Sequence, residues 1–272
     1  MKPAGRTARR RVLLTGAAGG IGQAFFRSAR DRYRFRLADR AAIAAEAVHA
    51  DGTGAEGDGA DHEAIQLDLV ELAACERACE QIDTVVHLAA DANPAAAFYE
   101  SLLDNNIKST YNIFRAAKDQ GCRRVIFASS AWVMGGYAPD VQLAPDAPTR
   151  PVNHYGVSKA FGEAVAACFA QAEGLSSIVV RIGAYDDGAA DNWLRRAPNV
   201  RELSTYVSAR DLHQLLVRCI EAPDVGFAIV HGVSENRFKR LDLTATRDLV
   251  GYAPQDDAFT IFGDTLDKWL RD

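Results

Sequence analysis

Short apolar runs alternate with amphipathic stretches along the chain from residue 11 to residue 181. Apolar runs of this length are typical of strands that are buried on both faces of a parallel sheet. Strands are therefore expected at residues 11–15, 33–38, 64–67, 84–88, 124–129 and 176–181. Helices are expected at residues 21–29, 72–81, 94–119 and 155–173. This alternation predicts an α/β fold, with a Rossmann-type doubly wound parallel sheet and helices on both of its faces.

The alternation weakens after about residue 185. Residues 186–198 form a polar stretch, which predicts a loop. Residues 209–221 are expected to form a helix whose first turn carries Asp211, a favourable charge at that end. Residues 227–231 predict one more strand. In a sheet of this kind ligands bind beyond the carboxyl ends of the strands, so the residues that follow each strand are the candidates for function.

The composition limits the possible partners. A net charge of −5 provides no basic face for a phosphate backbone, so nucleic acid is not an expected partner. No run approaches the ~20 apolar residues of a membrane span, and we expect a cytoplasmic protein with no membrane partner. Cys75 and Cys79 are four residues apart on an expected helix, but no histidine at ligand spacing accompanies them. We therefore expect reduced cysteines and no metal.

A glycine-rich segment follows the first expected strand. Gly16, Gly19 and Gly22 are three residues apart and open the first helix. Glycine permits a tight turn and lets backbone N–H groups approach a pyrophosphate, while the helix directs its positive end at that anion. This pattern between a strand and a helix predicts a dinucleotide-binding site.

Acidic residues end the next two strands. Asp39 stands 23 residues after Gly16, where a carboxylate can accept hydrogen bonds from ribose hydroxyls and repel a 2′-phosphate, which favours NAD over NADP. Arg40 works against this choice, because its guanidinium could pair with such a phosphate. Asp68 could reach the adenine amino group, or it could cap the following helix.

Three further residues have the chemistry for proton transfer. Ser130 ends the fifth strand, and Tyr155 and Lys159 share one face of an expected helix. A tyrosine has a pKa near ~10 and is a poor base until a nearby ammonium stabilises the phenolate. Tyr155 could then exchange a proton with a substrate hydroxyl or carbonyl that Ser130 holds, while hydride passes to or from a nicotinamide.

In combination these motifs resemble the extended short-chain dehydrogenase/reductase (NAD-dependent epimerase/dehydratase) family. The matching pieces are Thr15–Gly22, Asp39, Asp68–Leu69, His87–Ala90, Asn106–Ala117, Ser129–Ser130 and Tyr155–Lys159. The resemblance implies a Rossmann fold with Ser130, Tyr155 and Lys159 as catalytic residues. With the motifs above, it predicts that NAD contacts Gly16, Ala18, Gly19, Gly20, Ile21, Gly22, Asp39, Arg40, Asp68, Leu69, Leu88, Ala89, Ala90, Asn106, Tyr155, Lys159 and Ile182.

Within that family the chain looks most like uronate dehydrogenases and related small sugar dehydrogenases. The likeness rests on Phe127–Ser130, Tyr155–Glu163, Val180–Gly183 and Arg201–Tyr206. Such enzymes oxidise C1 of a sugar acid to a lactone, and the arginine that matches Arg201 binds the substrate carboxylate. A guanidinium fork suits a carboxylate or a phosphate, although a salt bridge from Arg201 to Glu202 or Asp191 is the alternative. The resemblance implies substrate contacts from Asp91, Ser130, Ala131, Trp132, Tyr155, Gly183 and Arg201.

Two segments depart from that group. Its members follow the catalytic serine with Asn-His, where this chain has Ala131 and Trp132. They also carry a serine-bearing, glycine-rich segment where this chain has Asp91-Ala92-Asn93. Both changes replace polar substrate contacts and leave the identity of the substrate open, while the redox chemistry is retained. Trp132 could form a stacking wall for a sugar ring or pack in the core.

The sequence therefore predicts an NAD-dependent dehydrogenase that acts on CH–OH groups and transfers hydride from C1 of a uronic acid or aldose to NAD. Three alternatives remain: a nucleotide-sugar epimerase/dehydratase with retained NAD, a sugar phosphate 1-dehydrogenase with Arg201 and Arg195 or Arg196 on the phosphate, and an NAD(P)-sensing binding protein without activity. The first needs more chain than the 113 residues that follow Lys159, and sensors often lose the catalytic Tyr or Lys.

The same reasoning divides the chain into three parts: a flexible tail at residues 1–10, an NAD-binding Rossmann core at residues 11–183, and a small carboxyl-terminal substrate-binding portion at residues 184–272 that packs on the core. In the family, the helices that match residues 95–119 and 155–173 pair with their copies in a second subunit. The resemblance therefore implies a homodimer.

Overall fold

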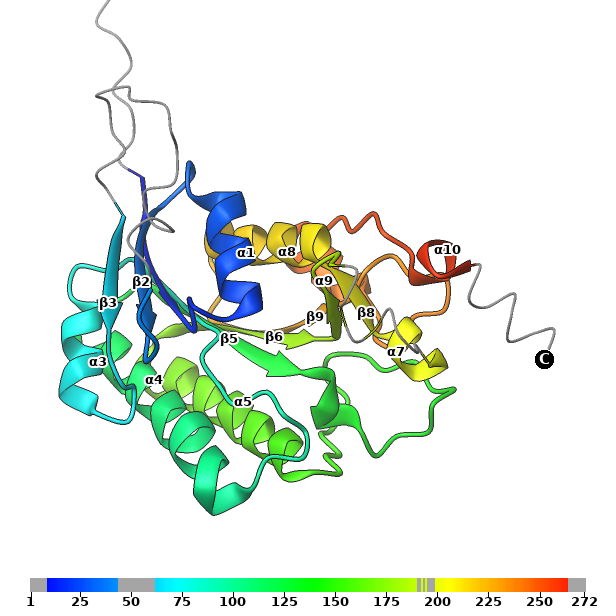
Figure 1. Ribbon diagram of the computed structural model, residues 1–272, viewed down its shortest axis with the longest axis horizontal. Coiled ribbons are helices and arrows are strands. Elements are labelled where there is room, and N and C mark those ends of the chain that lie inside the picture. Colours follow the sequence, from blue (N-terminus) through cyan, green and yellow to red (C-terminus); the bar gives the residue numbers. More distant parts are fainter. Residues whose placement is uncertain (1–8, 44–61, 190–191, 193, 195–198, 264–272) are drawn as a thin grey trace, which may run out of the picture.

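The computed structural model describes residues 9–43, 62–189, 192, 194 and 199–263. Within these residues seven parallel strands form one sheet, in the order β3-β2-β1-β4-β5-β6-β9 (Figure 1). The strands are β1 (Arg11–Thr15), β2 (Arg34–Asp39), β3 (Glu63–Gln66), β4 (Thr84–His87), β5 (Arg124–Ser130), β6 (Ser176–Ile182) and β9 (Phe227–Gly232). The Rossmann-type fold is confirmed, and each strand lies within one residue of its expected bounds.

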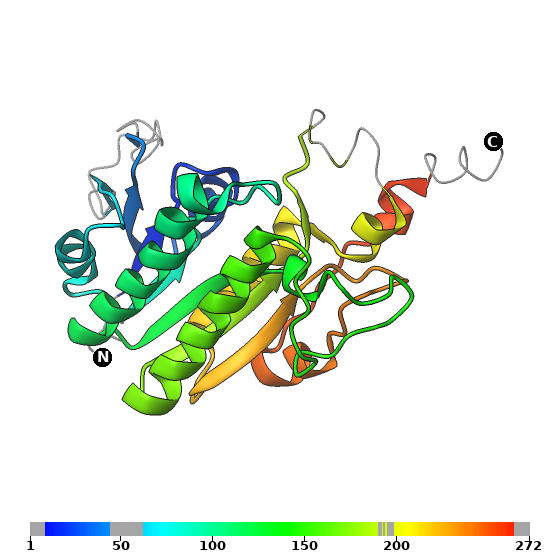
Figure 2. The ribbon, with the colours of Figure 1, turned by 90° about the horizontal axis from the view of Figure 1, so that it is seen from below.

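Helices cover both faces of the sheet, as Figures 1 and 2 show. On one face lie α1 (Gly20–Ala29) and α8 (Ala209–Glu221), and on the other lie α3 (Leu72–Cys79), α4 (Ser109–Asp119) and α5 (His154–Glu173). Val12 and Leu14 of β1 belong to the cluster under α1 and α8, whereas Leu13 belongs to the cluster under α3 to α5. Successive residues of β1 are therefore buried in opposite layers, which explains why this strand is continuously apolar.

The helix expected at residues 94–119 begins at Phe98 and changes type along its length. Its first part is a π-helix, η2 (Phe98–Lys108), and its second part is the α-helix α4. The backbone N–H and the Oγ of Ser109 both donate to the carbonyl of Asp104, five residues earlier. The widened turn leaves Asn106 buried, where its amide binds the backbone of Asp91 and the hydroxyl of Ser158. These contacts with distant segments outweigh the local preference for an α-helix.

The helix expected at residues 72–81 also ends early, at Cys79, because Gln81 takes a left-handed conformation with φ of 59°. Among the helices of the described residues, none is long and apolar enough to cross a membrane.

Residues after 183 serve two purposes. They supply α8 and β9 to the main sheet layer, together with α9 (Thr244–Val250). They also form a small parallel pair, β7 (Ala184–Asp186) and β8 (Tyr206–Ser208), with the short helices α7 (Val200–Ser204) and α10 (Ala258–Ile261) beside it. Much of the loop expected at residues 186–198 lies outside the described residues, and β7 takes its first residue. The strand pair β7 and β8 lies beyond the end of β6, next to the carboxyl ends of the strands, where ligands are expected to bind.

Candidate active site

The glycine segment adopts the geometry that the sequence predicts. Gly16 has φ of +71°, and a Cβ on it would lie 2.7 Å from the backbone nitrogen of Ala89. A Cβ on Gly22 would lie 2.3 Å from the Gly16 carbonyl oxygen. Gly19 precedes α1, whose first turn has no acidic residue and no side-chain cap among the described residues. The uncovered N–H groups of this turn suit an anion, so the loop fits the pyrophosphate of a dinucleotide.

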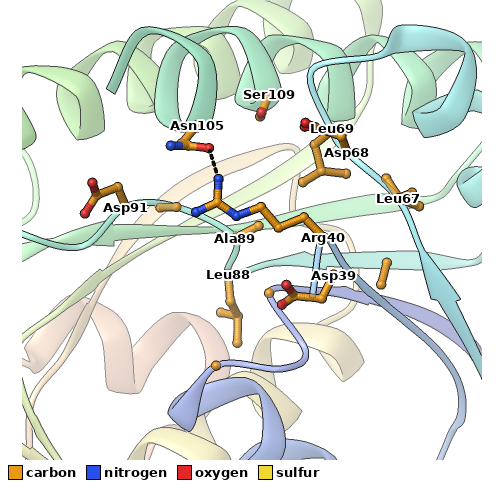
Figure 3. Close-up of a pocket in the computed structure, with 14 residues that line it drawn as sticks. Asp39, Arg40, Leu67, Asp68, Leu69, Leu88, Ala89, Asp91, Asn105 and Ser109 are labelled. Atoms are coloured by element: carbon orange, nitrogen blue, oxygen red, sulfur yellow. Dashed lines mark hydrogen bonds between the residues drawn. The ribbon is translucent and has the colours of Figure 1, made fainter. Parts of the chain in front are cut away.

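Asp39 ends β2 and Arg40 follows it, and their side chains contact different parts of the site. The two carboxylate oxygens of Asp39 each accept one backbone N–H bond at 3.0 Å, from Ala18 and from Ala41. The Arg40 guanidinium extends across the pocket and donates to Asn105 Oδ1 of η2 at 3.1 Å (Figure 3). Asp39 thus ties the glycine loop to β2 while keeping further lone pairs available for a ribose.

A pocket of about 180 Å³ lies beyond the carboxyl ends of β1, β2 and β4 (Figure 3). Nine of the residues expected to contact NAD line it, and Asp91, expected to contact substrate, joins them. The lining consists of Gly16, Gly19, Ala38, Asp39, Arg40, Leu67, Asp68, Leu69, Leu88, Ala89, Ala90, Asp91, Asn105 and Ser109. Apolar walls from leucine and alanine residues alternate with polar and acidic groups, a mixture that suits an adenosine.

Sequence reasoning missed four lining residues: Ala38, Leu67, Asn105 and Ser109. Ala38 and Leu67 each precede an aspartate that had been singled out, so the strand-end rule could have included them. Asn105 and Ser109 reach the pocket from η2 and the start of α4, which a regular helix pattern does not indicate. The other expected cofactor contacts do not line this pocket: Ala18, Gly20, Ile21, Gly22, Asn106, Tyr155, Lys159 and Ile182.

The three expected catalytic residues come together where β5 ends and α5 begins. Asn153 caps α5 by accepting the Gly156 N–H at 2.7 Å, and the helix then carries Tyr155 and Lys159 one turn apart. Lys159 Nζ donates to the Ala128 carbonyl of β5 at 2.8 Å and lies 5.8 Å from the centre of the Tyr155 ring. The Ser130 side chain lies close enough to the Tyr155 phenol to lower its pKa. All three residues are buried.

Burial controls the acidity of this group. It raises the pKa of the Tyr155 phenol, and the Ser130 side chain offsets this only in part. Burial lowers the pKa of Lys159 to about 7. The sequence led us to expect that the Lys159 ammonium lowers the pKa of Tyr155. The pKa of Tyr155 is instead raised, because burial disfavours the charged phenolate.

The expected substrate residues that follow β5 form a second group. Ala131 and Trp132 begin a short 3₁₀ turn, η3 (Ala131–Met134), in which the Trp132 N–H donates to Ser130 Oγ at 3.2 Å. The guanidinium carbon of Arg201 in α7 lies 4.8 Å from the centre of the Trp132 ring, and its Nη2 donates to the Gly135 carbonyl at 3.3 Å. Trp132 is partly exposed beside the candidate catalytic serine, with a cation on its face.

Within the described part of the chain, Arg201 forms no salt bridge with Glu202. Glu202 instead accepts the Asn199 N–H in a capping box at the start of α7. Asp191, Arg195 and Arg196 lie outside the described residues. Gly183 has a packing role, since a Cβ there would lie 1.7 Å from the Thr205 carbonyl oxygen.

Comparisons with known proteins extend over almost the whole chain. The model of the NAD dependent epimerase/dehydratase family matches residues 12–185. Uronate dehydrogenase of Pseudomonas putida is 34% identical over 255 residues, which are 92% of this chain and 85% of that protein. NAD-dependent glucose-6-phosphate dehydrogenase of Haloferax volcanii is 34% identical over 271 residues, which are 94% of this chain and 98% of that protein. A mutant uronate dehydrogenase from Agrobacterium tumefaciens, complexed with NAD, superposes with a TM-score of 0.80 at 30% identity, covering 96% of this chain and 90% of the other.

Proposed function

The chain belongs to the NAD-dependent epimerase/dehydratase family, and on that premise we propose that it is an NAD-dependent dehydrogenase that oxidises C1 of a uronic acid to the lactone. The observation that carries the proposal is the Arg201 guanidinium, which lies over Trp132 beside Ser130 without a carboxylate partner among the described residues. A cation that stacks on the residue bonded to the candidate catalytic serine, and that has no carboxylate partner among the described residues, suits an anionic substrate. Relatives matched over nearly their full length are named as dehydrogenases of a uronate or of glucose 6-phosphate, which supports the same reaction class.

NAD would be held by the pocket at the carboxyl ends of β1, β2 and β4. The glycine loop and the start of α1 would bind its pyrophosphate, and Asp39 would accept hydrogen bonds from the adenosine ribose. Asp68 and Leu69 would border the adenine. When bound, NAD accepts the hydride that leaves C1.

The proton of the C1 hydroxyl would go to Tyr155. Ser130, whose side chain lies close to the phenol, would hold the same substrate oxygen and fix its position. Lys159 lies on the same face of α5 and, when protonated, would stabilise the phenolate. Loss of the proton from the C1 hydroxyl and of the hydride from C1 converts the hemiacetal carbon to the lactone carbonyl, with Tyr155 taking the proton and NAD taking the hydride.

Absorbance of NADH tests the function directly. Purified protein is mixed with NAD and, in separate reactions, with glucuronate, galacturonate, neutral aldoses and sugar phosphates. We expect NADH to accumulate in stoichiometric excess over enzyme with a uronate. Absence of NADH with every sugar would contradict the proposal and favour an epimerase or dehydratase, which returns the hydride to its substrate.

A sugar phosphate 1-dehydrogenase is the second candidate. It is favoured by the similarity to the glucose-6-phosphate dehydrogenase over 98% of that relative, and by the suitability of a guanidinium for phosphate. NADH formed with a sugar phosphate and not with a uronate would select this candidate, with the same residues transferring the proton.

We also propose a homodimer. Large apolar side chains are exposed on η2, α4 and α5, which lie side by side on one face (Figure 2). They include Tyr99, Leu103, Tyr111 and Val157, exposed by 79%, 38%, 47% and 45%. Burying these residues against a second copy would remove an apolar surface from water.

A cytoplasmic location remains a prediction from the sequence.

A further inference from the structure

The backbone of Trp132 is fixed between the two elements that carry the candidate catalytic residues. Its N–H donates to Ser130 Oγ at 3.2 Å, at the end of β5. Its carbonyl accepts the Gly135 N–H and faces α5 so closely that a Cβ on Gly156 would lie 2.8 Å from the oxygen. The backbone from which the indole extends is therefore in contact with both the end of β5 and the start of α5.

The indole in turn supports Arg201. The guanidinium stacks 4.8 Å from the ring centre, and a long bond of 3.3 Å from Nη2 to the Gly135 carbonyl adds the second contact. Arg240, whose guanidinium binds the carbonyls of Ala138 and Tyr137, is a further positive charge nearby. The pKa of Arg240 is lowered by burial and by its repulsion from Arg201, and Asp140 opposes this in part. A long cationic side chain in such a neighbourhood would turn to solvent unless a surface such as the indole held it.

We propose that Trp132 is a positioning residue that holds the Arg201 guanidinium at the substrate site and thereby makes the enzyme select sugars that carry an anionic group. This inference rests on the proposed function and deepens it. It assigns the departure at Trp132 a purpose: the polar contacts found after the serine in the resembling enzymes are replaced here by one cation held on an aromatic ring. Selectivity would then depend on a contact between two protein side chains as well as on contacts with the sugar.

Substitutions at Trp132 and Arg201 test the proposal. Trp132→Leu keeps an apolar side chain without a π face, Trp132→Phe restores a face, and Arg201→Gln removes the cation. The KM and kcat of each are measured with the best uronate and with the matching neutral aldose. Binding of the uronate to the NADH-loaded enzyme, which cannot turn it over, is measured by calorimetry.

We expect Trp132→Leu to raise the KM for the uronate about tenfold relative to the KM for the aldose, as loss of a partly buried cation–π contact predicts. Trp132→Leu should weaken uronate binding by a similar factor, and Trp132→Phe should bind the uronate almost as tightly as the parent. In a protein that already carries Arg201→Gln, adding Trp132→Leu should weaken uronate binding little further. If Trp132→Leu leaves both the ratio of the two KM values and the binding constant for the uronate unchanged, the inference about Trp132 is overturned while the proposed function stands. A parent enzyme that forms no NADH with any sugar would remove the proposed function and this inference with it.

Discussion

At the scale of single residues, the protonation of Tyr155 and Lys159 determines whether the site can accept a proton. Burial raises the pKa of the phenol and lowers the pKa of the amine to about 7, so the first proton is lost near neutral pH. The state without that proton includes a minor form in which the phenol is ionised and the amine is protonated. This minor form has the base that oxidation of an alcohol requires.

The rate of sugar oxidation should therefore rise with pH. We expect kcat/KM to increase roughly tenfold per pH unit below about 7 and to level off above it, because the deprotonated pair is the active form. Initial rates of NADH formation between pH 5.5 and 9 give the profile. A flat profile over this range would contradict the assignment.

Lys159→Met should lower kcat by at least about 100-fold and move the rising limb to higher pH, since Tyr155 then titrates alone with a raised pKa. The variant should not lose thermal stability. Lys159 has a lower pKa in the folded than in the unfolded chain, so its burial costs free energy increasingly as pH falls from about 10.5 to about 7. Methionine avoids this cost. Parent-like kinetics in Lys159→Met would refute the mechanism.

Asp39 and Arg40 should set the choice of cofactor in opposite directions. Removing the Asp39 carboxylate by Asp39→Ser should weaken NADH binding and raise the NADPH-to-NADH affinity ratio about tenfold, because the repulsion of a 2′-phosphate disappears. Arg40→Ala should lower that ratio. Dissociation constants from titrations of NADH and NADPH fluorescence measure both effects, and a ratio that moves the same way in both variants would contradict this interpretation.

At the scale of elements, a buried ion pair joins α5 to β5 and β6. The Arg181 guanidinium donates to both carboxylate oxygens of Glu163, at 2.9 and 2.8 Å, and the Ser129 hydroxyl donates to one of them at 2.6 Å. Arg181 and Glu163 are only 1% and 5% exposed. Ser129 precedes Ser130, and Glu163 lies one turn after Lys159, so the pair sets the register between the strand end and the helix that share the candidate catalytic residues.

Glu163→Gln should leave the Arg181 charge buried without a counter-charge and cost about 3–5 kcal/mol of folding stability, a fall in Tm of roughly 10 °C. Thermal unfolding measures it. Replacement of both partners, Glu163→Leu with Arg181→Met, should recover much of the loss, because no charge then remains buried.

Asp119→Asn is the matched control. It breaks the more exposed ion pair between Arg115 and Asp119 and should change stability by less than about 1 kcal/mol. Equal losses in Glu163→Gln and Asp119→Asn would contradict the importance given to the buried pair.

At the scale of the whole molecule, the exposed apolar residues of η2, α4 and α5 predict the assembly. Leu103→Glu should convert the dimer to a monomer, since a charge in the centre of an apolar interface would be buried without a partner. Light scattering after size exclusion gives the mass. Phe238→Glu is the control, because Phe238 is 65% exposed in the segment between β9 and α9 and should leave the mass unchanged. A parent protein that is monomeric at high concentration would contradict the dimer.

The sequence by itself determined the sheet and the local parts of the site. Apolar runs and glycine spacing act over a few residues, so β1, Gly16 and the start of α1 could be predicted from neighbours in the chain. The positions of Asp39 and Ser130 followed from the rule that strand ends meet at one edge. These features depend on backbone geometry that nearby residues specify.

The tertiary structure alone decided the features that depend on distant contacts. The π-helix around Asn106 exists because that amide binds Asp91 and Ser158 across the molecule. The pKa of Lys159 follows from burial, which a spacing pattern does not reveal. The stacking of Arg201 on Trp132 joins residues 69 positions apart, and neither side chain predicts the other from its local sequence. Long-range packing fixes desolvation and charge environment, and these physical quantities decide which residues of a recognisable motif can perform the chemistry.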